Sequence, residues 1–388
     1  MAERDAGPVV VLAHPSPDLY GSDRMLVESV RALAPTRQVV VTLPAEGPLS
    51  QVLRDAGARI EILPIPVLRK AYMSPMGLLR LAFANLRALP KARRLLRRTG
   101  AEALYVNTIT IPIWLAAAKL ARVPALCHVH EAEEGLPRPV RAALSAPLRL
   151  ARTVVVNGRA SAAVLGSAGR RAQIIHNGVE EPPSVTEPRA TLTGPVRITL
   201  VGRLTPRKGS DIAIRAAGLL RERGYDVILT LVGSVFPGYE WVEEELRELA
   251  GDALEDGRVV LAGFRPQVWD SLAETDVAIV PSKVESFGNA AVEAMLAGRP
   301  VVASDLQGLA EIVTDGENGV LVPPGDPVAL ADGVARLLDD WDGALAMAKR
   351  ARADAARRFG KDRYHREMRE AVRALTDPGA PMRTSSIR

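Results

Sequence analysis

The chain has 388 residues, of which 47% are apolar and 24% charged, and this ordinary globular balance allows about two domains. Its single cysteine, Cys127, excludes an internal disulfide framework and a cysteine-rich metal site, and we expect it in a buried strand. No run of about 18 apolar residues could span a bilayer, and the N-terminus M-A-E-R-D-A-G carries acids where a signal peptide would be basic and then apolar, so we expect a cytoplasmic protein, at most at the inner face of a membrane.

The first half of the chain predicts short apolar strands that alternate with helices. Strands are expected at 9–13, 39–43, 59–63, 103–106, 125–129 and 153–156, with helices near 48–56 and 76–98 and one that ends at about Ala34. Because this alternation indicates a parallel sheet covered on both faces, we expect a doubly wound α/β domain. Gly21, at the helix entry after the first strand, permits close approach of the backbone to a ligand, although structural capping explains the same position.

Basic residues gather in the segment 69–98, within a stretch from Ile62 to Ala101 that contains no acid. In residues 76–98 they alternate with Leu and Phe at helical spacing, as in a helix on an anionic membrane surface. A solvated helix of an arginine-rich protein has the same pattern, and both interpretations stay open. We expect no nucleic-acid partner, because no recognised DNA- or RNA-binding module accompanies this segment.

Two patterns raise the question of a metal site. His128 and His130 lie at the end of the strand 125–129 with period-two spacing, which puts both imidazoles on one face, but the acids near them lack the spacing of a metal-binding helix. Asp340-Trp341-Asp342 sits between two predicted helices, where we expect a helix boundary with a capping acid. The sequence therefore predicts no metal site.

A Pro-rich polar stretch after Val179 interrupts the alternation, and we interpret it as an interdomain linker. The pattern then restarts, with strands at 196–201, 227–232, 259–262, 277–280, 301–303 and 320–322 and with helices at 211–223, at 239–249 and in the rest of the chain to about Leu375. We therefore expect two doubly wound domains, residues 1–180 and 181–359, with a cleft between them as the default binding site, and a disordered tail at 377–388.

Turns at strand ends of the second half are candidates for ligand binding. The turn G-R-L-T-P-R-K-G, residues 202–209, holds Arg203 and Lys208 between glycines, which suits a diphosphate. It matches neither the nucleotide-hydrolase loop nor the Rossmann fingerprint, and a solvated basic turn is the alternative. Gly233 and Phe264 follow the next two strands and would face the same cleft.

The stretch 280–304 predicts a strand, a loop, a helix over 289–297 closed by Gly298, and a second strand. Glu285 and Glu293 frame the loop, and they would lie about 12 Å apart along the axis if every step between them were helical. A glycosidase pair needs roughly 5 to 9.5 Å. The spacing suits instead a ligand with two polar ends and a phosphate centre over the helix start, and two solvated glutamates are the alternative.

These residues resemble the retaining, metal-independent glycosyltransferases of family 4, whose GT-B fold has two Rossmann-like domains that face a central cleft. Residues 285–293 are similar to the family's E-x7-E motif, including its internal Phe-Gly, and residues 202–209 to its phosphate-binding turn. I-I-H-N-G-V-E and E-I-V-T-D-G-E-N-G-V-L-V-P-P-G-D-P are similar to its interdomain segment and to the segment after the motif. The chain departs from the family pattern at Tyr20-Gly21-Ser22-Asp23, where the family has Gly-Gly, a small residue and an acid, and at 234–239, where it has a short glycine turn.

The resemblance implies a role for each candidate residue. Arg203 and Lys208 would neutralise the leaving nucleoside diphosphate in place of a metal. Glu285 would bind hydroxyls of the donor sugar, Glu293 would hold the ribose, and His130 would lie near the donor sugar and the acceptor. The other donor-binding positions would be small residues and aromatics of the strand-end loops: Gly21, Gly202, Gly233, Phe264, Ser286, Phe287, Gly288 and Asn289.

The resemblance further implies that the first domain binds the acceptor, that the second binds the nucleotide sugar, and that a C-terminal helix at about 360–376 packs back on the first domain. The expected reaction is transfer of a hexose from a UDP- or GDP-sugar to a hydroxyl acceptor, a polysaccharide or glycolipid precursor, without cofactor or metal. A nucleotide-sugar isomerase or epimerase on the same fold and a glycosyltransferase of small-molecule natural-product biosynthesis are the alternatives. A non-catalytic scaffold would leave the phosphate-binding turn and the glutamate pair without a purpose.

Overall fold

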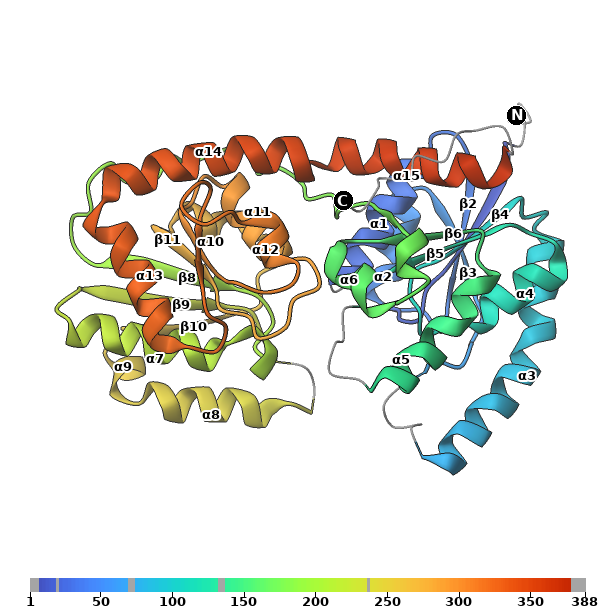
Figure 1. Ribbon diagram of the computed structural model, residues 1–388, viewed down its shortest axis with the longest axis horizontal. Helices are drawn as coiled ribbons and strands as arrows, with labels where there is room; N and C mark the ends of the chain where they lie inside the picture. The colour runs from blue at the N-terminus through green and yellow to red at the C-terminus, as the bar shows by residue number, and fades with distance from the viewer. Residues whose placement is uncertain (1–6, 19–20, 69–73, 132–136, 236–237, 378–388) are drawn as a thin grey trace. The chain divides into compact units, whose positions relative to one another are not determined.

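The chain divides into two compact units (Figure 1). The computed structural model describes residues 7–18, 21–68, 74–131, 137–235 and 238–377. The first unit comprises Met1–Gly178 and Lys361–Arg388, and the second comprises Val179–Gly360. The predicted disordered tail falls, apart from Asp377, outside the described residues, as does Tyr20 of the loop in which the chain departs from the family pattern.

A seven-stranded parallel sheet forms the centre of the first unit, in the order β3-β2-β1-β4-β5-β6-β7. Its strands are β1 (Val9–Ala13), β2 (Gln38–Leu43), β3 (Ala58–Ile62), β4 (Ala103–Val106), β5 (Ala125–Val129), β6 (Thr153–Val156) and β7 (Gln173–Ile174). The helices of the unit are α1 (Gly21–Leu33), α2 (Pro48–Asp55), α3 (Pro75–Arg98), α4 (Ile113–Ala121), α5 (Arg138–Ser145), α6 (Arg159–Val164) and α15 (Lys361–Thr376). The sequence did not predict β7, because two residues are too few to show an apolar pattern.

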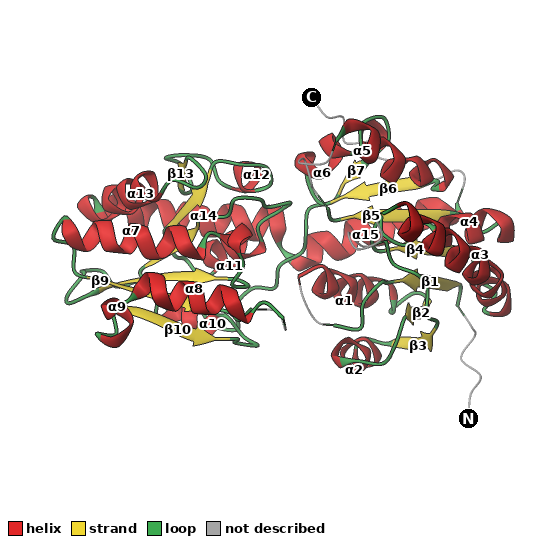
Figure 2. Ribbon diagram, turned by 90° about the horizontal axis from the view of Figure 1, so that it is seen from below, coloured by secondary structure: helices red, strands yellow, loops and turns green. Residues whose placement is uncertain are grey.

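Helices cover both faces of this sheet (Figure 2). Alternate strand residues point to opposite faces, so that Val10 and Leu12 pack with α1, α2 and α15, whereas Val11 and Ala13 pack with α3 and α4. The predicted burial of Cys127 is confirmed, and it lies on the second of these faces.

The C-terminal helix α15 is part of the core of the first unit although it is distant in sequence. Tyr364, Met368 and Val372 recur at helical spacing and are fully buried with residues of α1 such as Leu26 and Leu33. Helix α15 therefore covers, together with α1 and α2, one face of the sheet of the first unit.

The second unit repeats the architecture with six parallel strands in the order β10-β9-β8-β11-β12-β13. The strands are β8 (Val196–Val201), β9 (Val227–Val232), β10 (Val259–Gly263), β11 (Val277–Val280), β12 (Val301–Ser304) and β13 (Val320–Val322). The helices are α7 (Ser210–Glu222), α8 (Glu240–Ala250), α9 (Asp252–Glu255), α10 (Trp269–Ala273), α11 (Asn289–Leu296), α12 (Leu309–Ile312), α13 (Pro327–Asp339) and α14 (Trp341–Phe359). The predicted pair of doubly wound parallel sheets is confirmed.

Two apolar layers sandwich the second sheet as well. Val277 and Ile279 face the layer made by α7, α8 and α13, and Ala278 and Val280 face the layer made by α10, α11, α12 and α14. The predicted helix boundary at Asp340 is confirmed, because its side chain accepts a hydrogen bond from the backbone N–H of Gly343 at 3.1 Å at the start of α14. None of the helices described here combines the length and apolar character of a bilayer-spanning segment.

Asp276 ties the predicted linker to the second sheet. This carboxylate is fully buried directly before β11. It accepts hydrogen bonds from Arg189 Nε at 2.8 Å and from the backbone N–H of Arg197 at 2.7 Å. The segment between the last strand of the first unit and β8 is therefore held by charge, although its Pro-rich sequence has no regular structure.

Arg299 is a further arginine near Asp276, and only 1% of its surface is exposed. Burial lowers the pKa of its guanidinium, and the neighbouring Asp276 carboxylate opposes that shift. Removal of one member of a buried pair costs more than the pair contributes, because the remaining charge stays without compensation.

We predict that Asp276→Ala destabilises the second unit by about 3 to 5 kcal/mol in the free energy of unfolding, since Arg189 and Arg299 lose their counter-charge. The urea midpoint followed by tryptophan fluorescence measures this, because Trp241, Trp269 and Trp341 all lie in the second unit.

Asp332→Ala is the matched control. Asp332 is exposed and pairs with Arg223 at 2.7 Å, and an exposed pair of this kind contributes about 1 kcal/mol at most. Equal midpoints for Asp276→Ala and Asp332→Ala would contradict the assignment of Asp276 as the anchor.

Candidate functional site

Three consecutive strand-end turns of the second unit are held together through their backbones. The N–H of Gly202 donates to Val232 O at 2.9 Å, and the N–H of Gly233 donates to Gly263 O at 2.9 Å. A Cβ at Gly233, where φ is +156°, would lie 1.8 Å from Gly202 O. Glycine is therefore required at this position, and the carboxyl ends of β8, β9 and β10 lie in line.

The turn after β8 ends in a short 3-10 helix, η4 (Pro206–Lys208), which contacts the loop after β11. The backbone N–H of Lys283 donates to Arg207 O at 2.7 Å. Gly209 has φ +71°, and a Cβ there would lie 2.0 Å from Pro281 O. The basic turn and the glutamate loop are thus fixed against each other by main-chain contacts that only glycine allows.

Lys208 and Glu285 meet where these two loops touch. Lys208 Nζ donates to Glu285 Oε2, and Ser282 Oγ donates to the same oxygen at 3.3 Å. The lysine and glutamate side chains keep 30% and 14% of their surface exposed. Arg203 is half-buried in the same turn, so both predicted phosphate-binding cations lie at the carboxyl end of β8, and the structure brings one of them onto the predicted glutamate.

The loop that carries Glu285 is anchored on both sides. The backbone N–H of Glu285 donates to Gln307 Oε1 at 2.9 Å, and the carbonyl of Glu285 accepts from the N–H of Gly308 at 3.1 Å. Phe287 is 2% exposed and its ring meets Phe359 edge-on, with 5.5 Å between the ring centroids. The ring of Phe287 therefore anchors the loop in the core, and only its backbone stays in the strand-end loop.

The helix α11 begins at Asn289, directly after Gly288, and Gly298 with φ +72° follows its end as predicted. Residues 285–288 form a loop, as predicted, so the separation calculated for an all-helical path between the two glutamates does not apply. Glu293 is half-buried in the second turn of α11. The N–H groups of the first turn point away from the helix body and carry partial positive charge.

The remaining predicted residues of this unit differ in exposure. Ser286 and Asn289 are half-buried at either side of the buried Gly288. Phe264, after β10, is 60% exposed, which leaves an aromatic face at a strand end. Two partners of Glu285, Ser282 and Gln307, were not predicted, although Ser282 lies in the strand-end loop that the sequence singled out.

His130 of the first unit ends a chain of hydrogen bonds that the sequence analysis missed. His130 Nε2 lies 2.9 Å from Asn107 Oδ1, and Asn107 Nδ2 lies 3.1 Å from His14 Nδ1. His14 Nε2 in turn lies 2.8 Å from Asp23 Oδ1. His14 follows β1, Asn107 follows β4 and His130 follows β5, so the residues after the strands of one sheet edge converge as they do in the second unit.

A second branch connects this chain to the core. Tyr105 donates its hydroxyl proton to Asn107 Oδ1 at 3.0 Å and lies 2.7 Å from His128 Nδ1. Ser29 Oγ lies 3.1 Å from the Tyr105 hydroxyl and 2.7 Å from that of Tyr364 in α15. His128 is fully buried inside β5, its ring centroid 4.0 Å from that of His130, which confirms that both imidazoles share a face.

Burial favours the uncharged forms of two histidines and two tyrosines of this network, His128, His130, Tyr105 and Tyr364. It lowers the pKa of His130 to about 3, with His14 as a second cause, and it lowers the pKa of His128 well below its ordinary value. Burial raises the pKa of Tyr105 well above its ordinary value and raises that of Tyr364 to about 12. His130 is therefore a neutral imidazole near neutral pH.

Gly21 is the first residue of α1, two positions before the buried Asp23. Glu131, next to His130, accepts hydrogen bonds from the N–H of His130 at 2.9 Å and from the hydroxyl of Thr108 at 2.5 Å, and burial raises the pKa of Glu131.

Across the part of the chain that the structure describes, no three His, Cys, Asp or Glu side chains gather in a way that could hold a metal ion.

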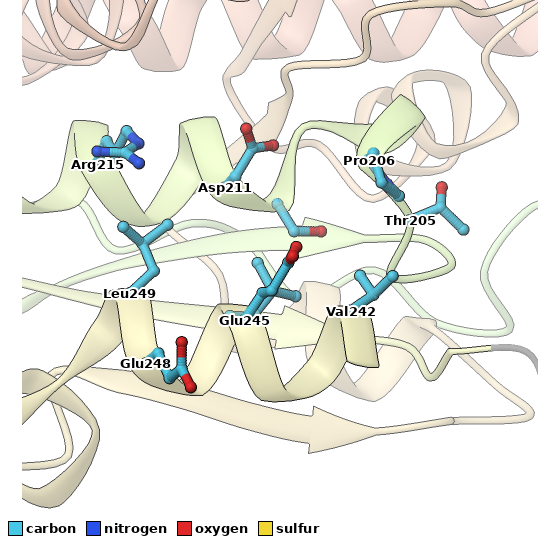
Figure 3. Close-up of a pocket in the computed structure, with 10 residues that line it drawn as sticks. Thr205, Pro206, Asp211, Arg215, Val242, Glu245, Glu248 and Leu249 are labelled. Atoms are coloured by element: carbon cyan, nitrogen blue, oxygen red, sulfur yellow. The ribbon is translucent and has the colours of Figure 1, made fainter. Parts of the chain in front are cut away.

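A cavity of about 500 Å³ lies beside η4 between α7 and α8 (Figure 3). Thr205, Asp211, Arg215, Glu245 and Glu248 contribute its polar lining. None of the predicted site residues lines it. It is a groove between two helices on one side of the basic turn, distinct from the contact of Lys208 with Glu285.

Comparison with known proteins finds relatives for both units of the chain. A family model described as glycosyl transferases group 1 matches residues 195–340, and a model described as glycosyltransferase family 4 matches residues 20–181. The 2-deoxystreptamine glucosyltransferase of Streptomyces kanamyceticus is 31% identical over 85% of this chain and 92% of its own length. The amylovoran biosynthesis glycosyltransferase AmsK of Erwinia amylovora is 30% identical over 54% of this chain and 53% of its own length, so this match spans about half of that relative.

Solved structures show the same fold. HepE of Anabaena, crystallised in complex with UDP and glucose, superposes with a TM-score of 0.78 over 94% of this chain and 99% of its own, at 23% sequence identity. The apo form of the lipopolysaccharide outer core galactosyltransferase WaaB superposes with a TM-score of 0.68 at 14% identity over 95% of this chain and 98% of its own. On the strength of the near full-length relative, the two family models and the shared architecture, the chain belongs to the family 4, group 1 glycosyltransferases and has their GT-B fold.

Proposed function

We propose that this glycosyltransferase transfers a hexose, with retention and without a metal, from a UDP-sugar to a hydroxyl acceptor. The observation that carries the proposal is the contact of Lys208 with Glu285, which joins the basic turn to the glutamate loop at the carboxyl ends of the strands. Arg203 and Lys208 bind the diphosphate, Glu285 binds sugar hydroxyls and Glu293 binds the ribose. The N–H groups at the start of α11 add partial positive charge to the same place.

The chemistry requires charge stabilisation more than a nucleophile. The acceptor oxygen bonds to the anomeric carbon while the bond from that carbon to the phosphate oxygen breaks, and the acceptor proton passes to the leaving diphosphate. Negative charge grows on the diphosphate, where fixed cations stabilise it most. Glu285 already accepts hydrogen bonds from Lys208 and Ser282, which favours a binding role over nucleophilic attack.

The solved neighbours favour uridine over guanosine in the donor. HepE of Anabaena was crystallised in complex with UDP and with UDP-glucose. Phe264, exposed after β10, offers an aromatic face on which the base of the nucleotide could stack. A GDP-sugar is the alternative donor.

Two acceptor classes have support from the relatives. AmsK, named for amylovoran biosynthesis, favours a carbohydrate acceptor, a polysaccharide or glycolipid precursor. The relative named 2-deoxystreptamine glucosyltransferase aligns over 92% of its length, and this favours a small aminocyclitol acceptor instead. We place the carbohydrate acceptor first, because α3 offers a surface suited to anionic lipid.

That surface is one face of α3. Met76, Leu79, Phe83 and Leu86 recur at helical spacing and are each between 55% and 66% exposed. Basic side chains share the face, and the guanidinium of Arg87 lies 4.0 Å above the ring of Phe83. An apolar stripe flanked by cations fits the boundary between headgroups and acyl chains of an anionic bilayer. We propose peripheral contact with such a membrane.

We predict that Lys208→Ala lowers kcat by a factor of about 100 to 1,000, because one preorganised contact to the diphosphate typically contributes this much. The rate of UDP release from UDP-glucose in the presence of acceptor measures it. Lys283→Ala is the control, since Lys283 lies in the adjacent loop and pairs with Asp211 at 2.8 Å. Equal turnover of wild type and Lys208→Ala would rule out the proposed site.

We predict that turnover persists in excess EDTA, because Arg203 and Lys208 replace the metal. The assay mixes UDP-glucose with a carbohydrate acceptor or with an aminocyclitol and identifies the product by mass. Conversion of the sugar nucleotide without any acceptor would point to an isomerase. Loss of turnover in EDTA that Mg²⁺ or Mn²⁺ restores would contradict the metal-independent mechanism.

We predict that the triple variant Leu79→Gln, Phe83→Gln and Leu86→Gln binds vesicles of phosphatidylserine and phosphatidylcholine at least about tenfold more weakly than wild type, since burial of each apolar side chain contributes on the order of 1 kcal/mol or more. Co-sedimentation measures the binding. Leu120→Gln, at an exposed leucine of α4, is the control. Unchanged binding of the triple variant would remove α3 as the membrane contact.

A further inference from the structure

The hydrogen-bond chain from Asp23 to His130 has a defined direction. The Tyr105 hydroxyl donates to Asn107 Oδ1, which as an amide oxygen can only accept, while the Nδ2 group at the other end of the amide can only donate. Asn107 Nδ2 therefore donates to His14 Nδ1 across 3.1 Å. His14 then carries its proton on Nε2, where it donates to Asp23 Oδ1 at 2.8 Å.

The same assignment fixes the tautomer of His130. Asn107 Oδ1 accepts, so His130 Nε2 carries the proton that lies between them at 2.9 Å. The Nδ1 atom of His130 is then an unprotonated acceptor. Because burial keeps the pKa of this imidazole far below neutrality, a second proton does not remove that acceptor at the pH of the reaction.

The residues behind His130 are more deeply buried than His130 itself. His14, Asp23 and Asn107 are 4%, 3% and 1% exposed, whereas His130 is half-buried. A buried carboxylate and a buried amide are expensive to desolvate, and an apolar core would be cheaper. This desolvation cost has an explanation if the hydrogen-bond chain determines which nitrogen of His130 carries the proton, because His130 is the member that reaches the surface of the unit.

We propose that Asp23, His14 and Asn107 are positioning residues that hold His130 as the Nε2–H tautomer, so that its Nδ1 accepts a hydrogen bond from a substrate hydroxyl. This rests on the proposed function and on the place that the family resemblance implies for His130, near the donor sugar and the acceptor. The Asp23 carboxylate sets the direction of these hydrogen bonds, because an ionised carboxylate can only accept a hydrogen bond.

The test begins with the wild-type protein and needs no substrate. Proton–nitrogen correlation spectra of uniformly ¹⁵N-labelled protein distinguish the two neutral tautomers and the charged form of each histidine. The chain has five histidines, so His→Gln variants assign the signals. We expect His14 and His130 each as a single Nε2–H tautomer at neutral pH. His130 protonated on Nδ1, or charged, overturns the proposal.

The second arm uses Asp23→Asn, which removes the charge and keeps the shape. We expect His14 and His130 to populate both tautomers and kcat to fall by about 10- to 100-fold, the usual effect of losing a partner behind a functional histidine. Calorimetric affinity for UDP should stay unchanged, because the diphosphate turn belongs to the second unit. Asp55→Asn, at an exposed position of α2, is the control with wild-type tautomers and kcat.

The outcomes distinguish a failure of the positioning role from a failure of the proposed function. Altered tautomers with unchanged kcat, or unchanged tautomers with any kcat, overturn the positioning role. If Asp23→Asn does not fold, the wild-type spectrum still decides the tautomer, and His14→Gln replaces it in the kinetic arm. A wild-type protein that neither binds UDP nor transfers sugar overturns the proposed function, and the tautomer assignment is judged independently of it.

Discussion

The contact of the Lys208 ammonium with the Glu285 carboxylate is the interaction on which the proposed donor site depends. At 30% and 14% exposure the pair adds little to stability, because partly solvated ion pairs contribute about 1 kcal/mol or less. The pair instead holds the two side chains in place before a substrate binds. In the proposed reaction, a diphosphate carries more charge than one carboxylate, so it would take the lysine from Glu285 and free that carboxylate for the hydroxyls of the sugar.

This exchange requires that the basic turn and the glutamate loop keep their relative positions. Close main-chain contacts at glycine residues hold them there. Gly209 approaches Pro281 O, and Gly233 approaches Gly202 O, so closely that no Cβ fits at either position. The ring of Phe287, buried against Phe359, fixes the glutamate loop from the other side. Main-chain contact thus sets the positions of the charged side chains, and the side chains remain able to change partners.

The sequence predicts the strands, the helix after the glutamate loop and its closing glycine, because apolar alternation and capping residues are local signals. It does not predict Gln307, His14 or Asn107, since each acquires its partner from a strand that is a neighbour only in the folded sheet. Strand order is not a local property: β4 follows β3 in sequence but pairs with β1, which brings Asn107 to His14.

The two units solve different electrostatic problems with the same architecture. In the second unit Arg203 and Lys208 are partly exposed, so that a charged ligand could replace water there at low desolvation cost. In the first unit His130 is neutral, and its partners are buried. In the proposed role of His130, a neutral acceptor binds a hydroxyl at a lower desolvation cost than a charged group would. The convergence of His14, Asn107 and His130 at one sheet edge is therefore suited to orientation, and that of Lys208 and Glu285 to charge.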